Sequence, residues 1–214
     1  MFRVNGKTHR AGGICFGVAT AACLWGVPQT PTEIALATTL IASSSFGSLL
    51  PDIDHHNSTI TNQLKRGCRD IIEFPLRLFG FKPKRKQKRK SSRQQKKVET
   101  RQRKRNRRLP KALRHRGITH SPFLVMLIFL LSLLFYPCFS DWVQPYYFMA
   151  SFGTFIGMIS HLFLDGLTKD GIPVLAPLTY QKFRLLKLTT GKHEFVVLIL
   201  MVIVTTAIVC FRIQ

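Results

Sequence analysis

The 214-residue chain lacks the cysteine pattern of either a disulfide-stabilised domain or a thiolate metal site. Its five cysteines are odd in number and scattered, and no two of them form a CxxC pair. Acids are also scarce, with 10 Asp and Glu against 32 Lys and Arg. A net charge of +22 conflicts with 46% hydrophobic residues in an ordinary soluble domain. Charge and hydrophobicity must therefore occupy different parts of the chain.

Charge is missing from long stretches, and none occurs between Ile34 and Leu50. Such runs approach the roughly 20 residues that a helix needs to cross a bilayer. Small side chains in the first two runs favour close packing of a helical hairpin in lipid. We therefore predict an all-α, polytopic membrane bundle of about five spans. The runs are residues 11–27, 33–50, 123–139, 146–164 and 195–211.

The basic residues concentrate between the second and third runs, where residues 60–118 hold 23 Lys and Arg against three acids. Residues 58–81 alternate apolar and basic side chains, which predicts an amphipathic helix at a membrane surface. Residues 82–109 have almost no apolar side chains, so they cannot bury a core and should be disordered or loosely helical. The predicted organisation is an N-terminal hairpin (1–57), a basic insertion (58–114) and a three-span C-terminal half (115–214).

Lys and Arg are absent from the short loops 28–33 and 140–145, which predicts that these loops face away from the cytoplasm. The basic loop 165–192, the insertion and the N-terminus then lie on the cytoplasmic side of the membrane. With this topology all seven histidines fall on the cytoplasmic face. Their convergence indicates a common site.

The second run ends in Pro51-Asp52-Ile53-Asp54-His55-His56. Pro51 should stop the helix and leave these side chains on a turn at the membrane boundary. Carboxylate and imidazole groups are the ligands that suit zinc, manganese or iron. The alternative is an acidic loop with incidental histidines.

His161 and Asp165 are four residues apart, which places both side chains on one face of the fourth helix. An ionisable group inside an apolar run is costly, so His161 is a candidate functional residue. The alternatives are a buried histidine bonded to a backbone carbonyl and an aspartate that merely ends the helix.

His115 and His120 flank the Arg116-Gly117-Ile118-Thr119 turn before the third run. The guanidinium of Arg116 suits a phosphate or a carboxylate. His115 could instead belong to a solvated basic loop, and His9, before the first run, could be an interfacial residue.

The blocks described above, with Ser160–Thr168, Gly171 and Pro177, occur in an order that resembles the YdjM-type family. This family is described as predicted membrane-bound, metal-dependent hydrolases of the bacterial inner membrane, some of them LexA-regulated. It is distantly similar to zinc-dependent phospholipase C and P1-type nucleases. Residues 58–111 depart from the family pattern and look like an unusually long basic insertion.

The resemblance implies phosphoester hydrolysis at a divalent metal, with zinc the first expectation. It implies Asp52, His120, His161 and Asp165 as ligands. It implies His9, Asp54, His55 and His115 as further ligands or as groups that hydrogen-bond to the ligands. Asp54 or His55 is then a candidate general base, and Arg116 a candidate phosphate-binding residue. A substrate at headgroup level would be a lipid or lipid-linked phosphate, which makes membrane lipids the expected partners.

Two other functions fit parts of the sequence. A non-catalytic membrane protein could bind nucleic acid or anionic lipid through the basic residues 82–109. That segment contains no aromatic residue on which bases could stack, which weakens the nucleic-acid reading. A transporter could use intramembrane His and Asp as a proton relay, but these groups cluster at one face and not at the midplane.

Overall fold

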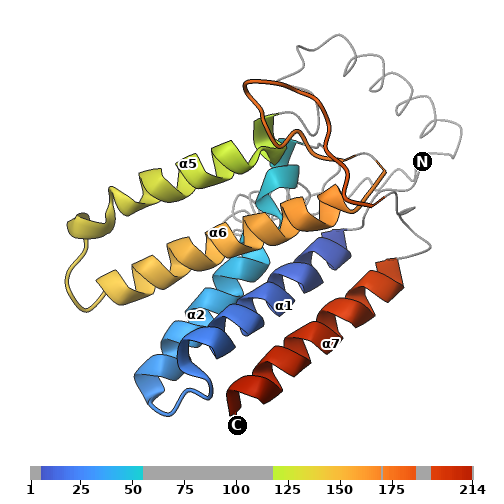
Figure 1. Cartoon of the computed structure of the whole chain (residues 1–214). Helices are drawn as coiled ribbons and strands as arrows, with labels where there is room; N and C mark the ends of the chain where they lie inside the picture. Colours follow the sequence, from blue (N-terminus) through green and yellow to red (C-terminus); the bar gives the residue numbers. More distant parts are fainter. Residues whose placement is uncertain (1–5, 55–117, 170, 187–193, 214) are drawn as a thin grey trace, which may run out of the picture.

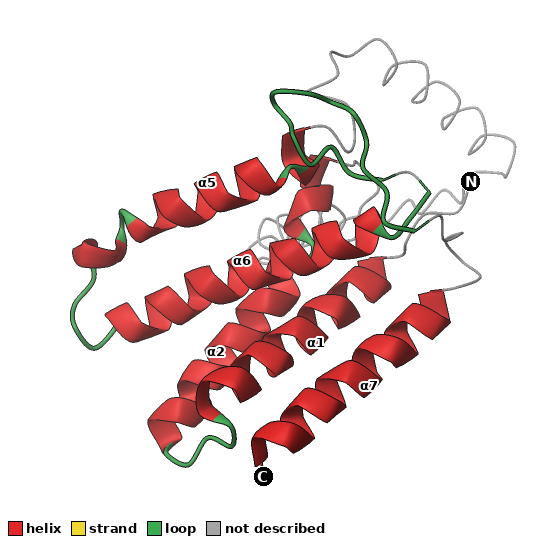
Figure 2. Cartoon of the chain, viewed as in Figure 1, coloured by secondary structure: helices red, strands yellow, loops and turns green. Residues whose placement is uncertain are grey.

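The computed structural model describes residues 6–54, 118–169, 171–186 and 194–213. Within these ranges the chain is all-helical, as predicted, and contains no strand. The helices lie side by side in one bundle, and only helices and loops are present in the described part (Figures 1 and 2). In chain order they are α1 (Gly6–Trp25), α2 (Pro31–Gly47), α5 (Pro122–Leu133), α6 (Gln144–Gly166) and α7 (Glu194–Ile213).

Local sequence signals fix where the helices begin and end. Thr30 caps α2 in a reciprocal capping box with Glu33, and Pro31 occupies the first turn. Ser121 caps α5 in the predicted manner, because its Oγ accepts a hydrogen bond from the backbone N–H of Phe123. At its other end α2 stops at Gly47, and a 3-10 turn, η1 (Leu50–Asp54), contains Pro51. Asp52 therefore lies on a turn, as the proline predicts.

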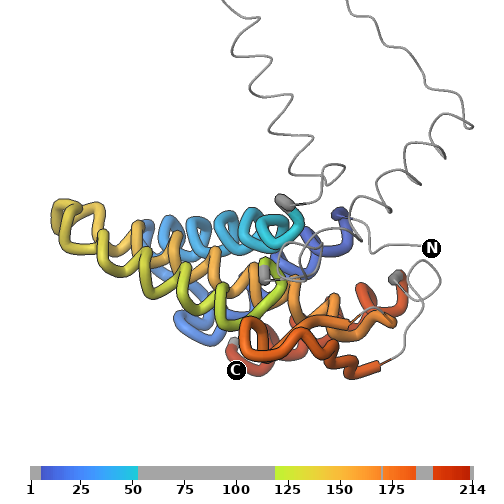
Figure 3. The backbone as a smooth tube through the Cα atoms, turned by 90° about the horizontal axis from the view of Figure 1, so that it is seen from above, coloured from blue at the N-terminus to red at the C-terminus, as the bar shows by residue number. Residues whose placement is uncertain are grey.

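The closest helix contact joins α2 and α6 through glycine. A Cβ built on Gly157 would meet the carbonyl oxygen of Ser44 and lie 2.7 Å from the backbone nitrogen of Ser48. One on Gly153 would meet the carbonyl oxygen of Leu40, and Gly47 lies similarly against Thr154. Small residues thus let the two backbones touch, which is how helices associate in lipid. Figure 3 shows the helices from above, turned by 90° from the view of Figure 1.

Two apolar clusters stabilise opposite parts of the bundle. One contains Ala21, Ala37 and Leu40 and joins α1 to α2. The other joins α5, α6 and the loop after α6, and consists of Val125, Met158, Leu162 and Ile172. This second cluster supports the end of the bundle at which α6 finishes and α5 begins.

The loop after α6 folds back over that end as a hairpin, residues 171–186. Ile172 and Phe183 exchange both backbone hydrogen bonds, at 3.0 and 2.8 Å. The N–H of Leu185 donates to the carbonyl of Gly166 at 2.9 Å, and the Ser121 hydroxyl donates to the carbonyl of Ala176 at 2.6 Å. The hairpin is therefore fastened to both α6 and the start of α5.

Within the described residues, three stretches are long and apolar enough to cross a membrane, namely Pro31–Asp52, Gln144–Gly166 and Phe195–Arg212. A shorter apolar stretch, Pro122–Cys138, combines α5 with the 3-10 turn η4 (Tyr136–Cys138). The expected five crossings and the orientation of the N-terminus remain predictions. The amphipathic segment, the basic insertion and both predicted domain boundaries lie outside the described residues.

The α2–α6 contact generates a test of the fold. We expect Gly157→Ala to destabilise the protein by about 1–3 kcal/mol, because the new methyl group overpacks the backbone of α2. Gly166→Ala in the same helix is the matched control, since its Cβ would meet nothing closer than 3.7 Å. Thermal unfolding in detergent should show a lower midpoint for Gly157→Ala alone. Equal midpoints for the two variants would contradict this account of the contact.

Candidate metal centre

Five polar side chains from four elements meet at one end of the bundle. His9 comes from the first turns of α1, and Asp52 comes from η1. His120 ends the 3-10 turn η3 (Ile118–His120), and His161 and Asp165 come from the last turns of α6. In Figure 1 these element ends lie together, where α1 begins and α6 ends. The chain thus gathers residues that are up to 156 positions apart in the printed sequence.

The imidazole Nε2 atoms face the two carboxylates. Nε2 of His120 lies 3.4 Å from Oδ2 of Asp165 and 3.7 Å from Oδ1 of Asp52. Nε2 of His161 lies 3.5 and 3.9 Å from the same two oxygens. Nε2 of His9 lies 3.7 Å from the other oxygen of Asp165. Three nitrogen and two carboxylate donors therefore surround a common space.

The orientation of His161 is set by a backbone group. Its Nδ1 lies 2.7 Å from the carbonyl oxygen of Ser48. Because a carbonyl can only accept, Nδ1 carries the proton and donates it, and a neutral ring then has its lone pair on Nε2. Histidines that bind metals are commonly oriented by such a bond from the second ring nitrogen. The α2–α6 contact thus presents Nε2 of His161 to the carboxylates.

Neighbouring groups also orient the other two imidazoles. The ring of His9 stacks on that of His161, with centroids 3.8 Å apart and an interplanar angle of 16°. Nδ1 of His120 lies 3.0 Å from the hydroxyl of Thr119, and the ring packs edge-on against His161 at 5.2 Å. Each ring is therefore held by contacts that leave Nε2 on the carboxylate side.

Burial is nearly complete for four of the five side chains. His120 and His161 are 0% exposed, Asp165 is 1% exposed and His9 is 2% exposed, whereas the side chain of Asp52 is 22% exposed. Within the described part of the chain, Asp52 is therefore the member of the centre that reaches the surface. An ion, water or substrate would approach from its side.

The spacing of the donor atoms suits a metal ion better than direct hydrogen bonds. Good N–H···O bonds span about 2.7–3.2 Å, shorter than any of the five nitrogen–oxygen distances above. Donors bound tetrahedrally at about 2.0–2.1 Å from a zinc ion are about 3.4 Å apart. In the part of the chain that the structure describes, two groups have their donor atoms close enough to hold an ion, His120–His161–Asp165 and His9–Asp52–His161.

Charge supports the same interpretation. The carboxylates of Asp52 and Asp165 lie against the same two imidazoles in a nearly closed space, where uncompensated charge is costly. A divalent cation would balance Asp52 and Asp165 while the three imidazoles stay neutral. Alternatively, protonated imidazoles would balance the negative charge of the two carboxylates. The cluster would then be a set of ion pairs with a purely structural role.

The structure brings together five of the nine residues that the sequence singles out, His9, Asp52, His120, His161 and Asp165. Asp54 ends η1 two residues after Asp52, and the structure describes its backbone alone. His55, His115 and Arg116 lie outside the described residues. The expected roles of these four as base, ligand or phosphate-binding group therefore remain predictions.

Two orienting groups were not among the predicted site residues. The carbonyl of Ser48 carries no side-chain signal, because any residue at that position would supply it. The hydroxyl of Thr119 lies beside His120 in sequence and could have been found by asking what orients that ring. For His161 the sequence left open a bond to a backbone carbonyl. That bond exists and leaves Nε2 available to the centre.

These features define a helical membrane protein with a buried histidine–aspartate centre at one end of its bundle. The family model described as YdjM inner membrane protein matches residues 4–213, and the chain belongs to this family. No curated protein and no solved structure matches the chain. The expected distant similarity to phospholipase C and P1-type nucleases therefore remains a prediction.

The centre predicts metal retention that depends on its buried ligands. We expect detergent-purified protein to carry a divalent metal, and Asp165→Asn and His161→Ala to weaken its binding by about a hundredfold or more, since weaker supporting contacts already cost 10–100-fold. Asp141→Asn is the matched control, because Asp141 is an exposed acid in the loop before α6. Elemental analysis measures the metal content. Well-folded wild-type protein without metal, even after metal is supplied, would favour the structural ion pairs.

Proposed function

We propose that the protein is a membrane-bound, metal-dependent hydrolase that acts on phosphoesters at a membrane surface. The observation that carries this proposal is the convergence of three imidazole Nε2 atoms and two carboxylates in a buried centre with one exposed edge. A purely structural cluster would not need Asp52 at the surface. A catalytic centre does, because its substrate must reach it.

The donor set favours zinc, with manganese or iron as alternatives, because imidazole and carboxylate ligands suit all three. Such an ion supplies an activated water and polarises the scissile phosphoryl group. His120, His161 and Asp165 would hold it, and their burial keeps bulk water from the inner side of the centre. Asp52 would complete the ligand set at the open edge.

The remaining predicted roles fit the position of this edge. Asp54 follows Asp52 within η1, so it is a candidate to take a proton from the attacking water. His55 is the alternative base, and Arg116 is the candidate that binds the phosphate. These three assignments come from the sequence and from the family resemblance.

The centre lies at the ends of helices that include two of the apolar stretches long enough to cross a membrane. It would therefore face the headgroup level of the bilayer, and the distribution of Lys and Arg assigns that side to the cytoplasm. A lipid phosphate or a lipid-linked phosphate is the substrate class that is concentrated there.

The competing functions explain less of the described structure. Binding of polyanions through residues 82–109 gives no role to a buried histidine–aspartate centre. A transport pathway would place such groups near the middle of the membrane helices, whereas these groups lie at the ends of α6 and α1. Hydrolysis therefore accounts best for the centre.

The test is hydrolysis of bis(p-nitrophenyl) phosphate and p-nitrophenyl phosphate by metal-loaded protein in detergent. We expect Asp165→Asn to lower kcat/KM by about a hundredfold or more, because the activated water is lost with the metal. Asp141→Asn should retain activity, and so should a variant without residues 82–109.

Loss of activity on deletion of residues 82–109, with the metal retained, would show that the insertion belongs to the catalytic unit. Absence of hydrolysis by fully metal-loaded wild-type protein, over a panel that includes lipid phosphates, would overturn the proposal.

A further inference from the structure

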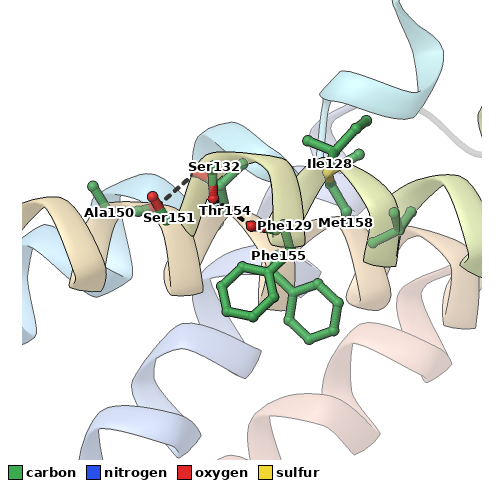
Figure 4. Close-up of a pocket in the computed structure, with 9 residues that line it drawn as sticks. Ile128, Phe129, Ser132, Ala150, Ser151, Thr154, Phe155 and Met158 are labelled. Carbon is green, nitrogen blue, oxygen red and sulfur yellow. Dashed lines mark hydrogen bonds between the residues drawn. The ribbon is translucent and has the colours of Figure 1, made fainter. Parts of the chain in front are cut away.

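A groove of about 200 Å³ lies between α5 and α6, on the apolar part of the bundle (Figure 4). Its walls are mainly apolar or small side chains from both helices. They include Val125, Phe129, Ala150, Ser151, Phe155 and Met158. Both helices that form the groove also lead into the candidate metal centre, since His120 precedes α5 and His161 lies in α6.

The chemistry of the groove favours an apolar occupant. Two hydroxyls in its wall are already bonded to their own helices. Ser132 donates to the carbonyl of Phe129 at 2.7 Å, and Thr154 donates to the carbonyl of Ala150 at 2.8 Å. Among the described residues, those that line the groove carry no charge. An ionic ligand would have no charged partner among these residues, whereas a hydrocarbon chain would pack against apolar side chains.

The groove borders the buried apolar cluster next to the metal centre. Val125 and Met158 line the groove and also belong to the buried cluster that contains Leu162 and Ile172. Met158 lies three residues before His161, which is about 4.5 Å along the helix axis. Ala150, at the other end of the groove, lies 11 residues before His161, or about 16 Å. The hydrocarbon of one leaflet is about 15 Å thick, half of the whole bilayer core.

The geometry points to a lipid substrate whose acyl chain lies in the α5–α6 groove while its phosphate ester reaches the His–Asp centre. This inference rests on the proposed function and specifies its substrate class. In the reaction a water oxygen bonds to phosphorus and the ester P–O bond breaks. The leaving oxygen then takes up a proton that the water has lost.

The exposed side chains of the hairpin beside the centre also suit a lipid substrate. Leu175, Leu178 and Leu186 are 61, 91 and 53% exposed at the end of the bundle where the centre lies. Lys182 and Arg184 are exposed among them. Apolar side chains interspersed with basic ones suit the boundary between acyl chains and anionic headgroups. The hairpin therefore fits the level at which a lipid would present its phosphate.

The kinetic test compares two chromogenic substrates with the same scissile bond, hexadecyl and ethyl p-nitrophenyl phosphate in mixed micelles. We expect wild-type kcat/KM to be at least about tenfold higher for the hexadecyl ester, because a chain held in the groove positions the phosphate ester at the centre and an ethyl group cannot. Ala150→Leu fills the groove and should remove this preference without changing ethyl ester hydrolysis or metal content. Ala42→Leu, at an exposed position on α2 outside the groove, is the matched control.

Photo-crosslinking tests groove occupancy without relying on activity. The probe is phosphatidic acid that carries a diazirine in one acyl chain, reconstituted with wild-type protein and both variants. We expect labelled residues to map to the α5–α6 groove, with labelling reduced in Ala150→Leu and retained in Ala42→Leu. Labelling spread evenly over all helices, or unchanged in Ala150→Leu, would overturn the lipid groove.

The two readouts separate this inference from the proposed function. Groove labelling, without hydrolysis by metal-loaded protein of these esters or of the panel that includes lipid phosphates, would refute the hydrolase and leave a lipid-binding groove. Hydrolysis of both esters at equal rates, with labelling outside the groove, would leave a hydrolase of water-soluble phosphoesters and refute the lipid inference.

Discussion

The approach of α2 to α6 at Gly157 is the contact on which the described structure depends. It brings the carbonyl of Ser48 within 2.7 Å of Nδ1 of His161, and this bond aims the imidazole at the two carboxylates. The hydroxyl of Ser44 extends the contact to a third helix by donating to the carbonyl of Gly13 at 2.7 Å. Helix packing and ligand orientation therefore share one cause, since a wider separation of α2 and α6 would remove both.

The burial of the centre strengthens the contacts that order it. In a nearly closed space, the stacked ring of His9 and the T-shaped contact of His120 with His161 restrict the orientations of the rings. The same burial makes the two carboxylates costly unless a cation is close. Order and charge balance thus both favour a centre that is complete when a metal is bound.

Much of the fold follows from local sequence signals. The apolar runs predicted the helices. Pro51 predicted the end of α2 and the turn that carries Asp52, and Ser121-Pro122 predicted the start of α5. The spacing of His161 and Asp165 placed both on one helix face. The convergence of the remaining members was predicted from a topology in which every histidine shares one membrane face.

The pairing of Ser48 with His161 could not be predicted from the sequence, because a backbone carbonyl has no residue signature and the two positions are 113 apart. Nor could the groove between α5 and α6, since its shape depends on how side chains from two helices leave space. Both features arise from tertiary packing, and short-range sequence patterns do not report which distant residues pack together.

The 3.7 Å approach of His120 to Asp52 has a consequence for the bundle beyond the centre. The turn η1 ends at Asp54 and η3 begins at Ile118, so the centre holds these two distant points of the chain close together. Chain entropy opposes such closure, and the cost rises by about 0.6 kcal/mol for each doubling of the number of residues between the two points. The residues that could bind an ion therefore also tie the turn after α2 to the turn before α5, so an ion held between them would stabilise the bundle as well as complete the site.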